Sequence, residues 1–125
     1  MTSDWTHWCA EDPDLAVEGR HVVVKFSNAR RQKVFVREQD DSYELFGYVD
    51  RSTSYRNDRE ILLGLWNRNR FTRRVGFRVD EHGHLVGESW IPKVGLTANE
   101  FRGHVRRTAE ECDRLEYLVA GRDQE

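Results

Sequence analysis

The last third of the chain contains one long amphipathic helix, and this helix constrains the fold more than any other segment. Thr97 and Glu100 form a capping box that predicts its start, and Gly121 is suited to end it. At about 1.5 Å per residue the helix would be roughly 33 Å long, enough to cross a small sheet. The segments before it are therefore expected to form the surface on which it packs. Its buried stripe, which repeats at steps of four and three, comprises Phe101, Val105, Thr108, Cys112, Leu115 and Val119.

Three short runs of alternating apolar residues upstream predict antiparallel β-strands. The first run begins at His21, the second covers residues 33–37 and the third covers residues 43–49. Polar segments suited to turns separate these runs, so the three strands are expected to form a meander. Residues 15–17 are too few to assign, and residues 4–9 are expected to form a short helical turn.

A helix and a hairpin connect this meander to the final helix. Asn57 or Asp58 is suited to cap a helix that runs to about Asn67, and residues 74–79 and 85–91 are predicted to pair as a hairpin. The order strand, strand, strand, helix, strand, strand, helix predicts an α+β fold with two layers. In it, an antiparallel sheet of about five strands is flanked by helices. The apolar side of the middle helix is predicted to comprise Ile61, Leu62, Leu65 and Trp66.

The length and composition of the chain are typical of one soluble domain. Residues 1–125 are expected to form a single unit, with residues 1–18 as a short N-terminal arm. Nothing resembles a signal peptide, and no apolar run approaches the roughly 20 residues that a membrane helix needs. A cytoplasmic location is therefore expected. Cys9 and Cys112 are expected to be free thiols, with Cys112 buried on the helix stripe and Cys9 more accessible.

Aromatic residues occupy strand positions that are predicted to face away from the helices. Neighbouring residues of a strand point to opposite faces, and the valine and leucine positions beside the aromatics are suited to face the helices. An apolar outer face is typical of a surface that binds a partner. Alternatively, the N-terminal tryptophans or a second copy of the chain would cover it. The predicted partner-binding residues are Phe35, Phe46, Tyr48, Trp90, Trp5 and Trp8.

The densest group of basic residues surrounds Phe71. Cationic side chains next to an aromatic ring are typical of sites that bind single-stranded nucleic acid. The alternative is a solvated helix end followed by the outer face of an edge strand, where acids such as Glu88 would neutralise the cations. The formal net charge of −2 argues against a general polyanion binder. The basic run comprises Arg68, Arg70, Arg73, Arg74 and Arg78.

The sequence contains no motif that specifies an enzyme, a cofactor or a metal site. His82 and His84 lie beside Glu81, but this arrangement is also typical of a polar hairpin turn, and zinc sites need three or four converging ligands. Neither a glycine-rich phosphate loop nor a nucleophile elbow is present. We therefore expect no cofactor, no metal and no catalysis, and an enzyme without a recognisable motif is the third alternative.

Four segments give the chain a resemblance to the YbjN family, bacterial proteins whose fold resembles that of type III secretion chaperones. Residues 62–68 resemble the family's helix that ends in an Asn-Arg step, and residues 80–86 resemble its acidic, glycine-containing turn. Residues 92–100 resemble its proline-to-Gly-Leu-Thr entry into the last helix, and residues 113–116 resemble the acidic end of that helix. The resemblance covers roughly four-fifths of the chain.

The resemblance implies an antiparallel sheet flanked by helices, frequent dimerisation, and a binding or chaperone-like role with no known substrate. Together with the aromatic positions, it predicts a non-enzymatic protein that docks a partner or a second subunit through an apolar sheet face. The alternative is a nucleic-acid or acidic-ligand binder that uses the basic run at residues 68–78.

Overall fold

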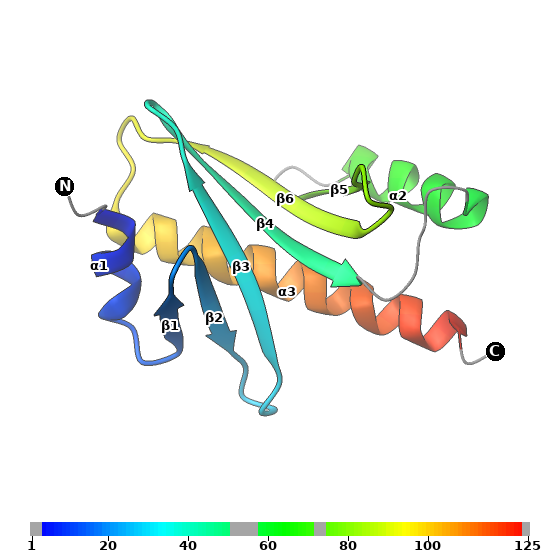
Figure 1. Cartoon of the computed structure of the whole chain (residues 1–125), viewed down its shortest axis with the longest axis horizontal. Helices are drawn as coiled ribbons and strands as arrows, with labels where there is room; N and C mark the ends of the chain where they lie inside the picture. The colour runs from blue at the N-terminus through cyan, green and yellow to red at the C-terminus, as the bar shows by residue number, and fades with distance from the viewer. Residues whose placement is uncertain (1–3, 51–57, 72–74, 124–125) are drawn as a thin grey trace.

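The computed structural model describes residues 4–50, 58–71 and 75–123 (Figure 1). Six strands form one antiparallel sheet in the order β1-β2-β3-β4-β6-β5, which confirms the predicted α+β class with one strand more than expected. No helix within the described ranges is long and apolar enough to cross a membrane. The elements are α1 (Asp4–Ala10), β1 (Leu15–Glu18), β2 (His21–Lys25), β3 (Arg31–Glu38), β4 (Ser42–Asp50), α2 (Arg59–Phe71), β5 (Gly76–Val79), β6 (Leu85–Pro92) and α3 (Ala98–Asp123).

The additional strand is β1, which pairs with β2 through a two-residue turn. Glu18 lies opposite His21 in the antiparallel register. Gly19 in the turn has a φ of 62°, a backbone conformation that glycine adopts without strain. Residues 15–17 alone cannot distinguish a strand from a loop, because a run this short becomes a strand only when a neighbour supplies its backbone hydrogen bonds.

Helix α3 crosses one face of the sheet, as its apolar stripe predicts (Figure 1). Its N-terminal half packs with α1 and strands β1 to β4 in an apolar cluster that includes Phe101 and Val105. Its C-terminal half packs with α2, β5 and β6 in a second cluster that includes Cys112 and Leu115. The helix therefore joins two parts of the core that lie over different strands.

The predicted start of α3 is present, whereas the predicted end is wrong. The Glu100 amide donates to Thr97 Oγ1 at 3.1 Å, and the Thr97 hydroxyl donates to Glu100 Oε1 at 2.9 Å. The helix continues past Gly121 to Asp123. Glycine permits a left-handed stop but does not impose one, so the helix continues where its backbone hydrogen bonds can still form.

Two glycines let α3 approach the sheet closely. Gly47 of β4 lies opposite Gly87 of β6, and Cys112 of α3 lies over both. A Cβ atom at position 87 would lie 2.6 Å from the Sγ atom of Cys112 and 2.9 Å from Cε1 of Phe77. One at position 47 would lie 3.2 Å from the same sulfur. The helix can occupy this position only because neither strand carries a side chain there.

We expect Gly87→Ala to lower the free energy of unfolding by about 1–3 kcal/mol, because the added methyl group must displace packed atoms. Urea denaturation would measure the loss. Cys112→Ala in the same chain should recover part of it, since one of the two clashing atoms is then absent. Gly103→Ala is the matched control: it lies on the exposed side of α3 with nothing within 4 Å. That change should stabilise the protein by about 0.5–1 kcal/mol. Equal effects at both positions would contradict the close approach.

Both cysteines are fully buried, so the expectation that Cys9 is more accessible is wrong. Cys9 shares the buried side of α1 with Trp5, which packs against Phe101 of α3. Burial raises the pKa of Cys9 to about 11, although the guanidinium groups of Arg102 and Arg106 oppose this shift. Burial also raises the pKa of Cys112 to about 12.

We expect neither thiol to react with a thiol reagent at pH 8 in the folded protein, and both to react after denaturation. Because the folded pKa values lie above the ordinary value of 9.0, the buried neutral thiols contribute stability below about pH 9. That contribution is lost as the pH rises through 11 and 12. Rapid labelling of either cysteine under native conditions would show that α1 or α3 does not pack as described.

Candidate functional site

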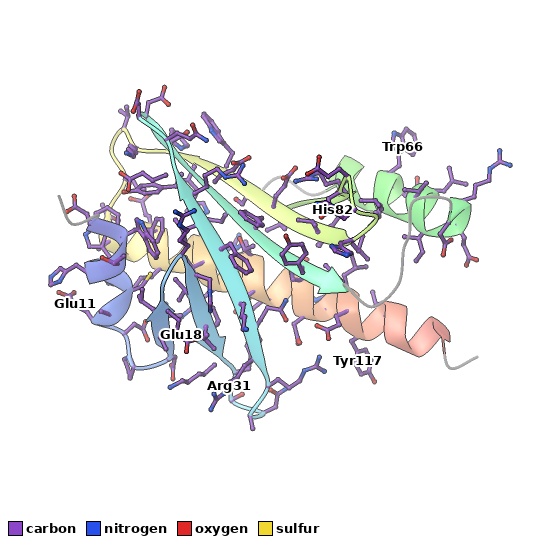
Figure 2. The ribbon with its side chains drawn as sticks, in the orientation of Figure 1. Glu11, Glu18, Arg31, Trp66, His82 and Tyr117 are labelled. Carbon is purple, nitrogen blue, oxygen red and sulfur yellow. The ribbon has the colours of Figure 1, made fainter. Side chains whose placement is uncertain are left out.

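The face of the sheet turned away from α3 carries a series of aromatic rings. Side chains of β3, β4 and β6 project from this face toward the viewer in Figure 2. Phe35 and Phe46 are paired in register and stack with ring centroids 5.3 Å apart. Tyr48 packs edge-on against both rings, at 5.8 Å and 6.2 Å. His21 extends the series beside Phe35, and His84 extends it beside Tyr48. We call these five residues the aromatic row.

The aromatic row lies where β3 and β4 separate. Their backbone pairing ends at Phe35 and Phe46, whereas β4 continues along β6. Beyond that point the side chain of Gln32 donates to the Tyr48 carbonyl oxygen at 3.1 Å. The strand alternation is as predicted, because Val34, Leu45 and their neighbours on the other face are buried. The rings of Phe35, Phe46 and Tyr48 remain only half-buried.

The four tryptophans predicted or available for binding do not share one surface. Trp90 lies on the same outer face, opposite Glu44 in register, and 65% of it is exposed. Trp5 is only 6% exposed, and Trp8 packs against Phe101 at 5.6 Å. Both therefore lie on the α3 side of the sheet. The prediction that Trp5 and Trp8 contribute to the outer face is wrong, because α1 docks against α3 and leaves that face uncovered.

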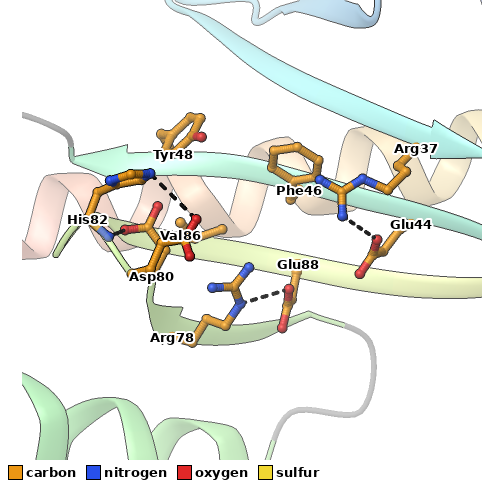
Figure 3. A pocket seen from close by; sticks show the side chains of 10 residues that line it. Arg37, Glu44, Phe46, Tyr48, Arg78, Asp80, His82, Val86 and Glu88 are labelled. Carbon is orange, nitrogen blue, oxygen red and sulfur yellow. Dashed lines mark hydrogen bonds and ion pairs between the residues drawn. The ribbon is translucent and has the colours of Figure 1, made fainter.

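Charged side chains in cross-strand pairs surround the aromatic rings. Arg37 lies 3.3 Å from Glu44, and its guanidinium group stands 5.5 Å from the centre of the Phe46 ring. Arg78 lies 3.0 Å from Glu88 on the other side (Figure 3). Between them is a pocket of ≈ 390 Å³ that Phe46, Tyr48 and Val86 line from the sheet. The outer face is thus apolar at its base and charged at its rim.

Only one side chain of the predicted basic run lies within the described part of the structure. Arg78 belongs to β5 and is paired with Glu88, the neutralising contact that the alternative interpretation anticipated. Arg73 and Arg74 lie outside the described residues, as do the side chains of Arg68 and Arg70. A nucleic-acid site on this run therefore stays a prediction.

The histidine turn between β5 and β6 is held by an aspartate. Asp80 Oδ1 accepts hydrogen bonds from the amides of His82 at 2.9 Å and His84 at 2.8 Å. Partial burial opposes ionisation of Asp80, but these two amides outweigh it and lower the pKa of the carboxyl group. Among the residues that the structure describes, no three potential ligands converge on a metal position. The turn is accounted for by its backbone hydrogen bonds.

Comparison with known proteins reveals a similarity of structure. No family model and no curated protein matches the chain. A chain in the structure of the HopA1–SchA chaperone–effector complex has a TM-score of 0.55 and 14% sequence identity, over 87% of this chain and 84% of that one. The Yersinia pestis type III secretion chaperone SycH, solved in complex with a fragment of YscM2, has a TM-score of 0.55 and 9% identity, over 86% of this chain and 96% of that one.

The fold is that of type III secretion chaperones. This part of the predicted resemblance is confirmed, and the resemblance to the YbjN family stays a prediction. At this level of sequence identity the comparison establishes the chaperone-like architecture, and the function has to be argued from the surface of this chain.

Helix α2 presents a second apolar surface, which the sequence analysis missed. Its predicted apolar side is partly wrong: Leu65 is buried and Ile61 is half-buried, whereas Leu62 and Trp66 are 39% and 60% exposed. Leu63 is 57% exposed. Figure 2 shows Trp66 pointing away from the sheet. We call Leu62, Leu63 and Trp66 the α2 patch.

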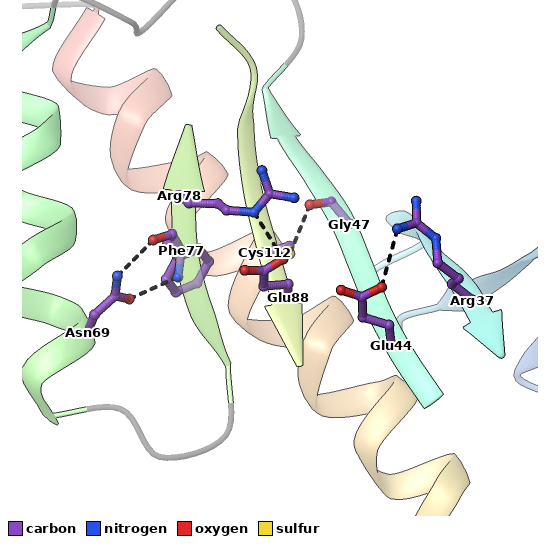
Figure 4. A network of polar contacts seen from close by, with 8 residues as sticks. All are labelled: Arg37, Glu44, Gly47, Asn69, Phe77, Arg78, Glu88 and Cys112. Carbon is purple, nitrogen blue, oxygen red and sulfur yellow. Dashed lines mark hydrogen bonds and ion pairs between the residues drawn. The ribbon is translucent and has the colours of Figure 1, made fainter. Parts of the chain in front are cut away.

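The position of α2 beside the edge strand explains this exposure. The Asn69 side chain donates to the Phe77 carbonyl oxygen at 2.7 Å and accepts from the Phe77 amide at 2.9 Å (Figure 4). It thus occupies both backbone groups that β5 would otherwise present to another strand. Because α2 lies alongside β5, it contacts the core through a narrow stripe around Leu65.

Proposed function

We propose that this chain is a non-enzymatic, chaperone-like protein that binds another protein through the outer face of its sheet. The observation that carries this proposal is the uncovered apolar surface formed by the aromatic row and Trp90. A sheet with helices on one side ordinarily carries polar residues on the other. Contiguous exposed apolar surface is a recognised mark of an interaction site.

Apolar docking provides the affinity in this proposal. Fully burying one aromatic side chain contributes roughly 1.5–3 kcal/mol, and Phe35, Phe46 and Tyr48 are half-buried in the isolated chain. The rim pairs of Arg37 with Glu44 and Arg78 with Glu88 would orient the partner. The chaperone-like fold of the SchA and SycH structures supports this role, because those proteins were solved in complex with protein partners.

A binding role accounts for the described polar residues better than catalysis does. Glu44 and Glu88 are engaged by arginines, and Asp80 is engaged by backbone amides. A general acid or base would instead need a carboxyl group whose pKa is raised toward neutrality. The two free, buried thiols are compatible with a reducing compartment, and we place the protein in the bacterial cytoplasm.

The α2 patch suits a second copy of the chain, and we propose that the protein is a homodimer. Closed two-fold dimers are the commonest oligomers, and they bring the same patch of both subunits together. Leu62, Leu63 and Trp66 lie along one flank of a helix, so two antiparallel copies would pack these side chains against one another. This arrangement leaves the outer sheet face available for the partner.

We expect Trp90→Glu to abolish partner capture while leaving the molar mass in solution unchanged. The charge would be forced into an apolar contact, where burial without a counter-charge is costly. Pull-down from native-cell lysate, with identification of the bound proteins by mass spectrometry, would measure capture. Circular dichroism would confirm that the variant is folded. Unchanged binding by a folded Trp90→Glu protein would refute the role of the sheet face.

Trp66→Glu is the matched variant, because the two tryptophans are similarly exposed at 60% and 65%. We expect it to lower the mass measured by light scattering from that of a dimer to the monomer value of 14.8 kDa. The partner proteins captured by the parent should still be captured. A parent protein that is monomeric at micromolar concentration would contradict the dimer but not the partner-binding face.

A further inference from the structure

The pocket on the outer face has a charge that identifies its occupant more closely. This inference rests on the proposed partner-binding function of that face. The pocket has a volume of ≈ 390 Å³, and Phe46, Tyr48 and Val86 provide apolar contact from β4 and β6. These contacts suit the aliphatic part of a side chain rather than a fully hydrated ion.

The rim of the pocket is acidic overall. Its lining includes two guanidinium groups, from Arg37 and Arg78, and four carboxylates. Each arginine already lies within 3.3 Å of a glutamate, Glu44 for Arg37 and Glu88 for Arg78. With His82 neutral, the lining therefore carries a formal charge of −2, and the two further negative charges come from Asp80 and Glu81.

The acidic side of the pocket is structurally fixed. Asp80 cannot turn away, because its Oδ1 atom accepts from the amides of His82 and His84 (Figure 3). Glu88 is held at 3.0 Å from Arg78 on the neighbouring strand. An anionic partner group would meet these carboxylates at close range, whereas a cation would be attracted to them.

We infer that this pocket receives a lysine or arginine side chain from an extended segment of the partner protein, and that an apolar residue of the same segment packs on Trp90. The aliphatic stem would lie against Tyr48 and Val86, with the charged head among the carboxylates. The occupant is thus a basic-apolar stretch of polypeptide in an open conformation.

The strand geometry sets the spacing within that segment. Trp90 and Val86 are four positions apart on β6, a separation of about 13 Å at the rise of a β-strand. Both point to the outer face, because alternate residues of a strand share a side. An extended partner that runs along β6 also presents alternate side chains to the sheet. Its basic residue is therefore expected two or four positions from the apolar residue.

Labelled peptides of about twelve residues, in which leucine and serine alternate, test the inference by fluorescence anisotropy. One leucine is replaced by arginine, by citrulline, which keeps the shape without the charge, or by glutamate. We expect the arginine peptide to bind about fivefold more tightly than the citrulline peptide, a difference typical of an exposed charge pair, and the glutamate peptide to bind most weakly. Equal affinity for arginine and citrulline, or no binding of the arginine peptide, would overturn the inference.

Variants of the pocket locate the effect. Glu81→Gln combined with Glu88→Gln should remove the preference for arginine, whereas Glu110→Gln on the exposed side of α3 should retain it. Trp90→Glu should weaken all three peptides. If it does so while arginine and citrulline bind alike, the basic-residue inference fails and the proposed function stands. If Trp90→Glu changes no peptide, the proposed face itself is wrong. Displacement of the arginine peptide by a single-stranded oligonucleotide would assign the pocket to nucleic acid instead.

Discussion

The close contact between α3 and the paired glycines of β4 and β6 is the constraint on which the rest of the structure depends. Gly47 and Gly87 allow Cys112 to rest on the backbone of the two central strands (Figure 4). The next position of β4 and of β6 points the other way, and there Phe46 lies opposite Glu88. The segment that positions the helix on one side therefore also determines the spacing of an aromatic ring and a carboxylate on the candidate binding face.

Those features that depend on short-range patterns could be predicted from the sequence. The stripe of α3, the capping box at Thr97 and the alternation that places Phe35 and Phe46 outward all follow from helix or strand periodicity. The side on which α1 packs does not follow, because the tryptophans of a short helix suit either face of a sheet. Trp5 packs on the α3 side since Phe101 is available there, and that contact joins segments far apart in the chain.

The candidate site shows the same division. Strand alternation predicts that Trp90 lies on the outer face, but the pocket beside it depends on how β5, β6 and the turn at Asp80 come together. The α2 patch was missed because Leu62, Leu65 and Trp66 share the spacing of a buried helix face. Only the location of α2 at the sheet edge determines that Leu65 faces the core while Leu62 and Trp66 do not.

The cap that Asn69 places on β5 has a consequence for how this protein can meet extended chains. A protein that holds unfolded polypeptide is at risk of adding those strands to its own sheet, and repeated addition leads toward fibrils. With the amide and the carbonyl oxygen of Phe77 both occupied, growth from that edge is blocked at its middle. Contact through side chains on the open face remains available, and such contact stays reversible because it forms no continuous backbone ladder.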